Sequence, residues 1–284
     1  MSIRMKERIR WLIRLARRHV VVVVLVGVLV LSGVAATVYI MINRCEWTTV
    51  YHGYGKVSCS QETIRLSPKA STRSDETHAA LATVNDMMVE AGSTQTITAT
   101  VRTDAQLRTG SDPNPWEVAW LLWSYTDGEH FYALALKPNG WEISKEDPAY
   151  PGAQRFRASG DAPAYPIGTA FDVTVTMTTA GDAVTMTVSV DGAELATVTD
   201  EESPYPSGAV AAYTEDATIT VGPVSITDSK GKPLPQIERG VLHTVPEGEF
   251  LPLGDSTQSF DGRYTGTVPL SRIQSRVVPL LAFW

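Results

Sequence analysis

WLLWSYTDGEHFYALALKPNGWEISKE, residues 120–146, contains three apolar stretches separated by Asp127-Gly128 and Asn139-Gly140. Such dipeptides favour tight two-residue turns between antiparallel strands, because both central positions of the turn need positive φ angles. The stretches between them are rich in the aromatic and aliphatic residues that strands favour. This segment therefore predicts three antiparallel strands joined by two hairpins.

The turns also predict which side chains share a face. With both dipeptides as turns, Trp120 lies opposite Ala135, and Lys137 lies opposite Glu142. Successive side chains of a strand point to opposite faces of the sheet. The core face consists of Leu121, Trp123, Tyr132, Leu134, Leu136, Trp141 and Ile143, with Lys145 at its edge. The opposite face consists of Trp120, Ser124, Ala133, Ala135, Lys137, Glu142, Ser144 and Glu146.

The opposite face combines an indole, small side chains and a lysine–glutamate pair. A sugar ring stacks its C–H face on an aromatic plane and takes directed hydrogen bonds from charged groups. We therefore predict a carbohydrate site here. Glu215 or Asp216 is expected to meet Lys137, Lys145 or Arg155 at its rim, and a loop of solvated acids is the alternative. The alternative is an ordinary solvated sheet face with a weak ion pair. The candidate ligand-binding residues are Trp120, Lys137, Glu142, Ser144, Lys145, Gln154, Arg155, Tyr213 and Glu215.

The chain on either side of this segment continues the strand pattern. Residues 96–101, 171–176 and 184–190 alternate with a period of two, and Asp191-Gly192 is a further hairpin signal. Many strands joined by hairpin turns form sandwiches or barrels. The predicted fold is therefore all-β, and the domain extends over residues 44–228.

Four segments carry a resemblance to a known family. They are PWEVAWL (115–121), HFYAL (130–134), KPNGWE (137–142) and SGAVAAYTED (207–216). They resemble the concanavalin A-like jelly roll, most closely the bacterial branch of 3-keto-disaccharide hydrolases, which is similar to family 16 glycoside hydrolases. The resemblance covers about residues 46–226. It implies a two-sheet antiparallel jelly-roll sandwich in which glycans lie across the concave sheet.

The catalytic motif of that family is altered in this chain. Family 16 glycosidases carry Glu-x-Asp-x-x-Glu on a central concave strand, whereas residues 142–147 read EISKED. The candidate catalytic carboxyls are Glu142, Glu146 and Asp147. Glu142 and Glu146 lie about 13 Å apart on a regular strand, which exceeds the spacing of about 5–9.5 Å in glycosidase pairs. A bulge would be needed to bring Asp147 onto the face, so the motif disfavours two-carboxylate hydrolysis.

The N-terminal region predicts a membrane anchor. Residues Val20–Ile42 carry no charge, span about 34 Å as a helix, and follow seven basic residues. Basic residues beside a span remain cytoplasmic. A buried helix and a cleaved signal peptide are the alternatives, but the run exceeds a signal-peptide core and lacks a small-residue cleavage site. The predicted parts are a cytoplasmic basic segment (1–18), a transmembrane anchor (19–43), an extracytoplasmic domain (44–228) and an extended arm (229–284).

The charge and the cysteines of the chain indicate which classes of ligand and which compartment are compatible with it. Residues 45–284 carry 16 basic and 30 acidic side chains, which excludes nucleic-acid binding through phosphate neutralisation. Cys45 and Cys59 are expected to pair in an oxidising compartment, although two separate thiols are the alternative. Asp200-Glu201-Glu202 is the candidate for a structural Ca²⁺ ion, and no other metal or cofactor is expected.

These features together predict a single-pass cell-membrane protein whose ectodomain is lectin-like and holds a cell-envelope or exported polysaccharide. A glycoside hydrolase acting on a 3-keto or unusual glycoside is one alternative. A structural subunit of a cell-envelope membrane complex is another, because residues 229–284 contain six prolines and end in the apolar run VVPLLAFW.

Overall fold

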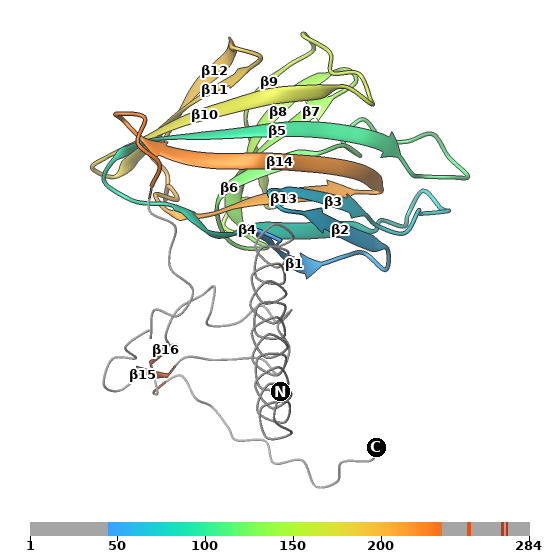
Figure 1. Ribbon diagram of the computed structural model, residues 1–284, viewed down its shortest axis with the longest axis horizontal. Coiled ribbons are helices and arrows are strands. Elements are labelled where there is room, and N and C mark those ends of the chain that lie inside the picture. The colour runs from blue at the N-terminus through green and yellow to red at the C-terminus, as the bar shows by residue number, and fades with distance from the viewer. Residues whose placement is uncertain (1–44, 235–248, 251–267, 270, 272–284) are drawn as a thin grey trace, which may run out of the picture. The chain divides into compact units, whose positions relative to one another are not determined.

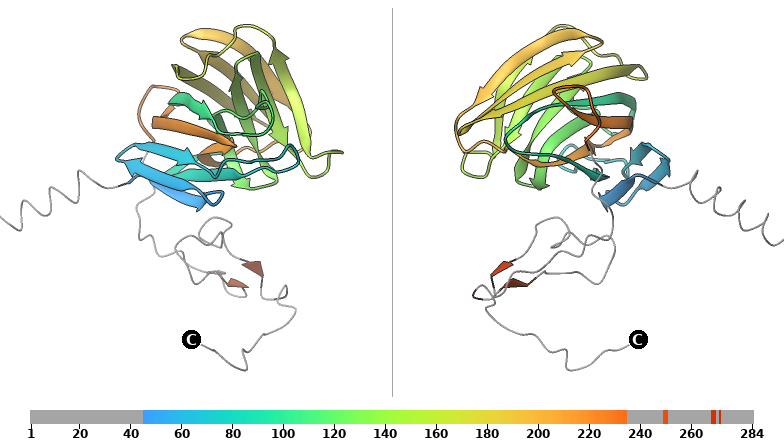
Figure 2. Two further views of the ribbon diagram at one scale, coloured as in Figure 1. Left: turned by 90° about the vertical axis from the view of Figure 1, so that its right-hand side faces the viewer. Right: turned by 60° about the vertical axis from the view of Figure 1, so that its left-hand side comes forward.

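The computed structural model describes residues 45–234, 249–250, 268–269 and 271 (Figures 1 and 2). Residues 45–234 form two antiparallel sheets packed as a sandwich, which confirms the all-β, two-sheet prediction. Within the described residues, no helix has the length and apolar character needed to cross a bilayer. The predicted anchor, Val20–Ile42, and almost all of the predicted arm lie outside the described residues.

Each sheet of the sandwich has seven strands. Sheet A consists, in spatial order, of β1 (Trp47–Tyr51), β4 (Ala79–Val89), β13 (Gly208–Glu215), β6 (Trp120–Asp127), β7 (His130–Lys137), β8 (Gly140–Glu146) and β9 (Gln154–Gly160). Sheet B consists of β12 (Ala193–Asp200), β11 (Ala183–Val190), β10 (Ala170–Ala180), β5 (Thr94–Gln106), β14 (Ala217–Asp228), β3 (Thr63–Ser67) and β2 (Lys56–Ser60). A separate pair is formed by β15 (Glu249–Phe250) and β16 (Val268–Pro269).

The core lies between the sheets and follows from the period of two. In β11 each second side chain is buried, so that valines and a methionine face sheet A while threonines face solvent. From sheet A, Trp123 stacks on Tyr132 with ring centroids 6.1 Å apart, and its Nε1 donates to the sulfur of Met186. All seven side chains predicted for the core face are buried in this cluster.

The β6–β7 hairpin confirms part of the predicted register. Trp120 pairs with Ala135, as expected, but the register shifts after Trp123. Ser124 there has a φ of +51° and its hydroxyl points inward to Met177. The next residue, Tyr125, consequently joins the outer face. The prediction that Ser124 lies on the outer face was therefore wrong, because a bulge resets the alternation.

The β7–β8 hairpin differs from its predicted register by two residues. Lys137 pairs with Gly140, and Ala135 pairs with Glu142. The turn is Pro138-Asn139, in which proline supplies the φ of the first central position. Gly140 follows at a φ of +132°, where a Cβ would lie 2.0 Å from the carbonyl oxygen of Gly160. A slip of two preserves the faces, so Lys137 and Glu142 still share the predicted face.

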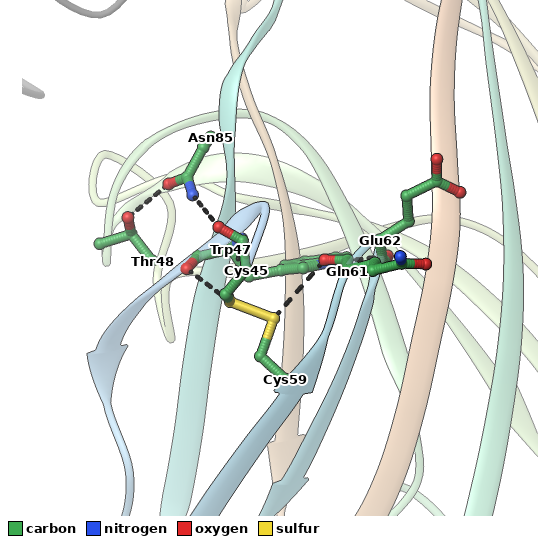
Figure 3. The surroundings of a disulfide bond; sticks show 7 residues. All are labelled: Cys45, Trp47, Thr48, Cys59, Gln61, Glu62 and Asn85. Carbon is green, nitrogen blue, oxygen red and sulfur yellow. Dashed lines mark hydrogen bonds between the residues drawn. A yellow bond between two sulfur atoms is a disulfide. The ribbon is translucent and has the colours of Figure 1, made fainter. Parts of the chain in front are cut away.

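A disulfide closes one edge of the sandwich, as Figure 3 shows. Cys45, just before β1 of sheet A, is bonded to Cys59 in β2 of sheet B, with Cα atoms 5.6 Å apart. This confirms the predicted pairing. Trp47 fills the core beside the bond, and its Nε1 donates to the carbonyl oxygen of Glu62 at 2.9 Å. The disulfide therefore joins the outermost strands of both sheets.

We expect Cys59→Ser to lower the free energy of unfolding by about 3 kcal/mol, the chain-entropy value for a loop of this length. For a domain of this size, the melting temperature should fall by about 6–12 °C. The measurement is thermal denaturation of the full-length chain in mild detergent. Ser58→Ala, at an exposed neighbouring position, is the control. An unchanged midpoint on reduction of the wild type would contradict this role.

Candidate functional site

The face of sheet A turned away from sheet B, here called the outer face, has an apolar floor. Its buried side chains form a second cluster, separate from the sandwich core. The cluster consists of Leu81, Val118, Trp120, Leu122, Tyr125, Ala133, Ala135 and Ala211. These side chains are 0–8% exposed, and partly buried residues that include Val50, Phe131, Ile167 and Tyr213 pack against them.

One line of paired residues crosses six strands of the outer face. Strand pairing places them side by side from β1 to β8. This outer-face row consists of Tyr51, Leu81, Tyr213, Trp120, Ala135 and Glu142. Five strand spacings give it a length of about 24 Å. Its middle residues Leu81, Trp120 and Ala135 are 1%, 8% and 2% exposed, so Tyr51, Tyr213 and Glu142 are the members of the row that reach solvent.

Trp120 lies on the predicted face but is largely covered. It is 8% exposed, its ring packs edge-on against Tyr213 at 5.6 Å, and its Nε1 donates to the carbonyl oxygen of Trp116 at 2.9 Å. The expectation of an open aromatic plane at Trp120 is thus not met. The indole forms the floor of the row.

The two ends of the row carry polar groups. At the β8 end, Lys137 and Glu142 form the predicted ion pair, with side chains 12% and 21% exposed. At the β1 end, the hydroxyl of Tyr213 donates to Glu215 at 2.6 Å. Burial, followed by the nearby charge of Glu215, raises the pKa of Tyr51 to about 12. Glu215 therefore meets tyrosines rather than the cations expected at the rim.

Glu146, Ser144 and Gln154 lie at the β8–β9 side of the outer face. Ser144 is buried, and the side-chain amide of Gln154 donates to its hydroxyl at 3.3 Å. Burial raises the pKa of Glu146, and repulsion from Glu129 and Glu215 adds to the increase. A carboxyl of this kind holds its proton more readily than an exposed one.

Lys145 does not reach the outer face. It is fully buried between the sheets, where its ammonium contacts Asp200 at 2.9 Å and the carbonyl oxygens of Glu202 and Ser203 at 2.6 and 2.9 Å. The ring of Tyr205 lies 4.5 Å from it. The inclusion of Lys145 among the ligand-binding residues was therefore wrong, since the inward alternation of β8 extends to this residue.

Asp147 and Arg155 belong to the same edge of the sandwich. Asp147 contacts Lys145 at 3.5 Å and Arg155 at 3.4 Å, so it is not on the outer face with Glu142. Arg155 also contacts Glu202 at 2.7 Å and lies over the ring of Tyr150. It lines a cavity of about 390 Å³ between β9 and β12. Its interactions close this edge rather than extend the row.

The acidic cluster considered for calcium surrounds Lys145. The Asp200 carboxylate and the Glu202 carbonyl point at the ammonium, which occupies the position of a cation. Burial opposes the charge of Asp200, but hydrogen bonds from Tyr132 and Lys145 hold the pKa of its carboxyl below the ordinary value. Among the described residues, no three His, Cys, Asp or Glu side chains gather as a metal site.

A serine, a histidine and an aspartate meet where β13 turns into β14. The hydroxyl of Ser71 donates to Asp216 and lies 3.2 Å from Nδ1 of His78. Arg108, which also binds the buried Glu117, donates to Asp216 at 2.9 Å. Because Ser71 is fully buried and its hydroxyl donates its hydrogen bond to Asp216 rather than to a base, it is not activated as a nucleophile. The cluster fixes the corner between the sheets.

A cavity of about 500 Å³ lies beside the β1 end of the row and was not predicted from the sequence. It lies between the β1–β2 turn and the start of β4. Its lining residues are Val50, Tyr51, His52, Gly53, Tyr54, Thr77, His78 and Ala79. The segment Gly53-Tyr54-Gly55, an aromatic residue between two glycines, is the signal from which it could have been found.

Comparisons with known proteins do not show a family for this chain. The profile of the family "Signal peptidase, peptidase S26" matches residues 176–282, well under half of the chain. No curated protein matches the sequence. Solved structures that resemble it include carbohydrate-binding module CBM66 from Bacillus subtilis, at 15% identity and a TM-score of 0.45, covering 66% of this chain and 98% of that one.

Two further solved structures resemble the chain at lower scores. A sialidase matches at 10% identity and a TM-score of 0.40, over 65% of this chain and 17% of its own. Sheep galectin-11 in complex with glycerol matches at 11% identity and a TM-score of 0.35, over 50% of this chain and 98% of its own. At these identities and scores, the neighbours do not identify a function.

We expect Lys145→Met to destabilise the protein by about 3 kcal/mol, because it removes the nearer cation of the buried Asp200 and leaves Arg157 at 3.6 Å. Lys137→Met, which breaks the partly exposed pair with Glu142, is the matched control and should cost about 1 kcal/mol or less. Urea denaturation measures both. Adding Asp200→Asn to Lys145→Met should recover part of the loss. Equal losses in the two methionine variants would contradict a structural role for Lys145.

We expect Glu146→Gln to raise the melting temperature at pH 7 and to change it little at pH 4. A carboxyl whose pKa is raised on folding stabilises the folded protein at low pH, and this contribution is lost as the pH rises through the folded pKa. Glutamine removes the charge that is disfavoured at pH 7. Glu142→Gln, which loses the contact with Lys137, should show no such gain. Differential scanning calorimetry of the variants and the wild type at both pH values measures these melting temperatures.

Proposed function

We propose that residues 45–234 form a carbohydrate-binding module and that a glycan lies along the outer-face row. The row itself is the observation that carries this proposal, because strand pairing aligns Tyr51, Tyr213, Trp120 and Glu142 across six strands. At one end of the row, the ring of Tyr51 is exposed and can stack on the C–H face of a sugar ring. The polar ends of the row supply hydrogen-bonding groups for hydroxyls.

The charges of the outer face favour an uncharged glycan. Glu142 is neutralised by Lys137, whereas Glu146 and Glu215 repel one another enough to affect the pKa of Glu146. The two other cationic candidates, Lys145 and Arg155, point into or along the sandwich edge. An anionic polysaccharide would therefore meet repulsion with little compensation.

The sequence supports the setting proposed for this module: a single-pass anchor at Val20–Ile42, a cytoplasmic N-terminus and an extracytoplasmic domain. The Cys45–Cys59 disulfide fits that placement, since disulfides persist in oxidising compartments. A cell-envelope or exported polysaccharide would then be the ligand. Residues 229–284 are the proposed contact with a membrane protein complex.

Glycoside hydrolysis has weaker support from the geometry. Glu142 and Glu146 lie four residues apart on the same face of β8, about 13 Å along the strand. That spacing exceeds the separations of glycosidase carboxyl pairs. Asp147, the third candidate, is engaged by Lys145 and Arg155 at the sandwich edge. The binding role accounts for the row without a catalytic pair.

Glycan arrays followed by calorimetric titration of the full-length chain in detergent test this function. We expect binding to neutral polysaccharides, weakened about 3–10-fold by Tyr213→Phe and by Glu142→Gln, since each removes a hydrogen-bonding group of the row. Tyr150→Ala, at the opposite edge of the sandwich, is the control and should bind as the wild type does. Absence of binding across neutral glycans, or equal binding by both row variants and the wild type, would refute the proposal.

A further inference from the structure

The cavity at the β1 end of the outer-face row has a rigid aromatic wall. Tyr54 stands in the β1–β2 turn and is 82% exposed, and its ring meets that of His78 edge-on at 5.8 Å. Tyr51, which is 40% exposed, belongs both to the cavity and to the row. The cavity volume of about 500 Å³ is within the range of small-molecule sites.

The turn that carries Tyr54 is held tightly. A Cβ on Gly53 would lie 2.5 Å from the carbonyl oxygen of Ala79, and one on Gly55 would lie 2.0 Å from that of Ser67. Backbone hydrogen bonds from Gly55 to His52 and from Lys69 to Gly53 close the turn. The backbone is thus packed against two other segments, which leaves the tyrosine little freedom to move with it.

Tyr54 itself adopts an unfavourable backbone conformation. Its φ is +58°, in the left-handed region, where a bulky aromatic residue is an outlier. Residues kept in such conformations cluster at binding sites and other functional positions. Here the strain aims a nearly fully exposed ring along the cavity wall.

The imidazole of His78, which contacts the edge of the Tyr54 ring, is fixed from beneath. It lies between the hydroxyl of Ser71 and the carboxylate of Glu76, which is 3.5 Å from Nε2. The backbone N–H of His78 donates to the buried Asp216. The corner between the sheets therefore positions His78 against Tyr54 before a ligand arrives.

Charge restricts the ligand class. The described lining residues include no Lys, Arg, Asp or Glu. Charged groups nearby are Glu215, beside Tyr51, Glu76, beside His78, and Lys69, whose backbone N–H donates to Gly53 and whose charge acts on Glu76. Acidic groups therefore outnumber the cation. An anionic ligand would meet no lysine or arginine in the lining, whereas a neutral ring can stack on Tyr54 and bond to hydroxyl and imidazole groups.

We propose that this cavity is a subsite for one uncharged sugar ring, stacked on Tyr54, at the β1 end of the outer-face row. The inference rests on the proposed carbohydrate-binding function and adds the position and class of one ring. It predicts that Tyr54 contributes to affinity although it contributes little to the folded core.

The experiment uses the full-length chain in detergent, with neutral β-1,3-, β-1,4- and α-1,6-linked hexose oligosaccharides as probes and oligogalacturonate as the anionic probe. Tyr54→Gly is the test variant, because glycine adopts this φ without strain and the fold should stay as stable as the wild type. We expect about a tenfold loss of affinity for the neutral probe that binds the wild type. Tyr150→Ala, another exposed tyrosine, should leave affinity unchanged, and oligogalacturonate should not bind.

Each outcome decides a separate point. If a neutral probe binds, Tyr213→Phe weakens it and Tyr54→Gly does not, the subsite is refuted and the proposed function stands. If Tyr54→Gly weakens binding and the row variants do not, the subsite stands and the row is refuted as the track. If no neutral probe binds the wild type, both proposals are overturned. If oligogalacturonate binds and Tyr54→Gly weakens that binding, the proposed ligand class is overturned.

Discussion

Closure of the two open edges of the sandwich is the constraint on which the rest of the structure depends, because the core stays dry only while the sheets are held face to face. Along β1 and β2 the closure is covalent, through Cys45–Cys59. Along β9 and β12 it is ionic: Arg157 donates to the Thr199 carbonyl, and the buried Lys145 holds Asp200. The covalent edge acts by restricting the unfolded chain, whereas the ionic edge is stable only if every buried charge is paired.

The sequence predicted the faces of the central strands better than their registers. The β7–β8 pairing differs from expectation by two residues, yet Lys137 and Glu142 keep their predicted face because the period of a strand is two. The bulge at Ser124 has the opposite effect, since one extra residue exchanges the faces that follow it. Lys145 could not be placed from a local pattern, because its partner Asp200 is supplied by the edge strand of the other sheet.

In the candidate site, too, local alternation predicted which face a residue is on but not its contacts with distant segments. Local alternation found Trp120 and Glu142, which face outward from neighbouring hairpins, but it could not show that Trp116 and Tyr213 cover the indole. The cavity beside the row was missed because its two walls are far apart in the chain. Tyr54 comes from the first turn of the domain, while His78 is held by Asp216 at the corner after β13. Only the folded chain brings these walls together.

The backbone strain at Tyr54 connects the fold to the proposed binding role. A left-handed backbone at a bulky residue costs about 1–3 kcal/mol, a sizeable part of the total stability of about 5–15 kcal/mol of a typical domain. Burial of the ring does not offset this cost, because the side chain remains 82% exposed. A glycine would occupy the turn with less strain. The backbone hydrogen bonds that close the turn offset part of this cost. A sugar stacked on the exposed face of Tyr54 would add the apolar contact that this ring lacks in the free protein.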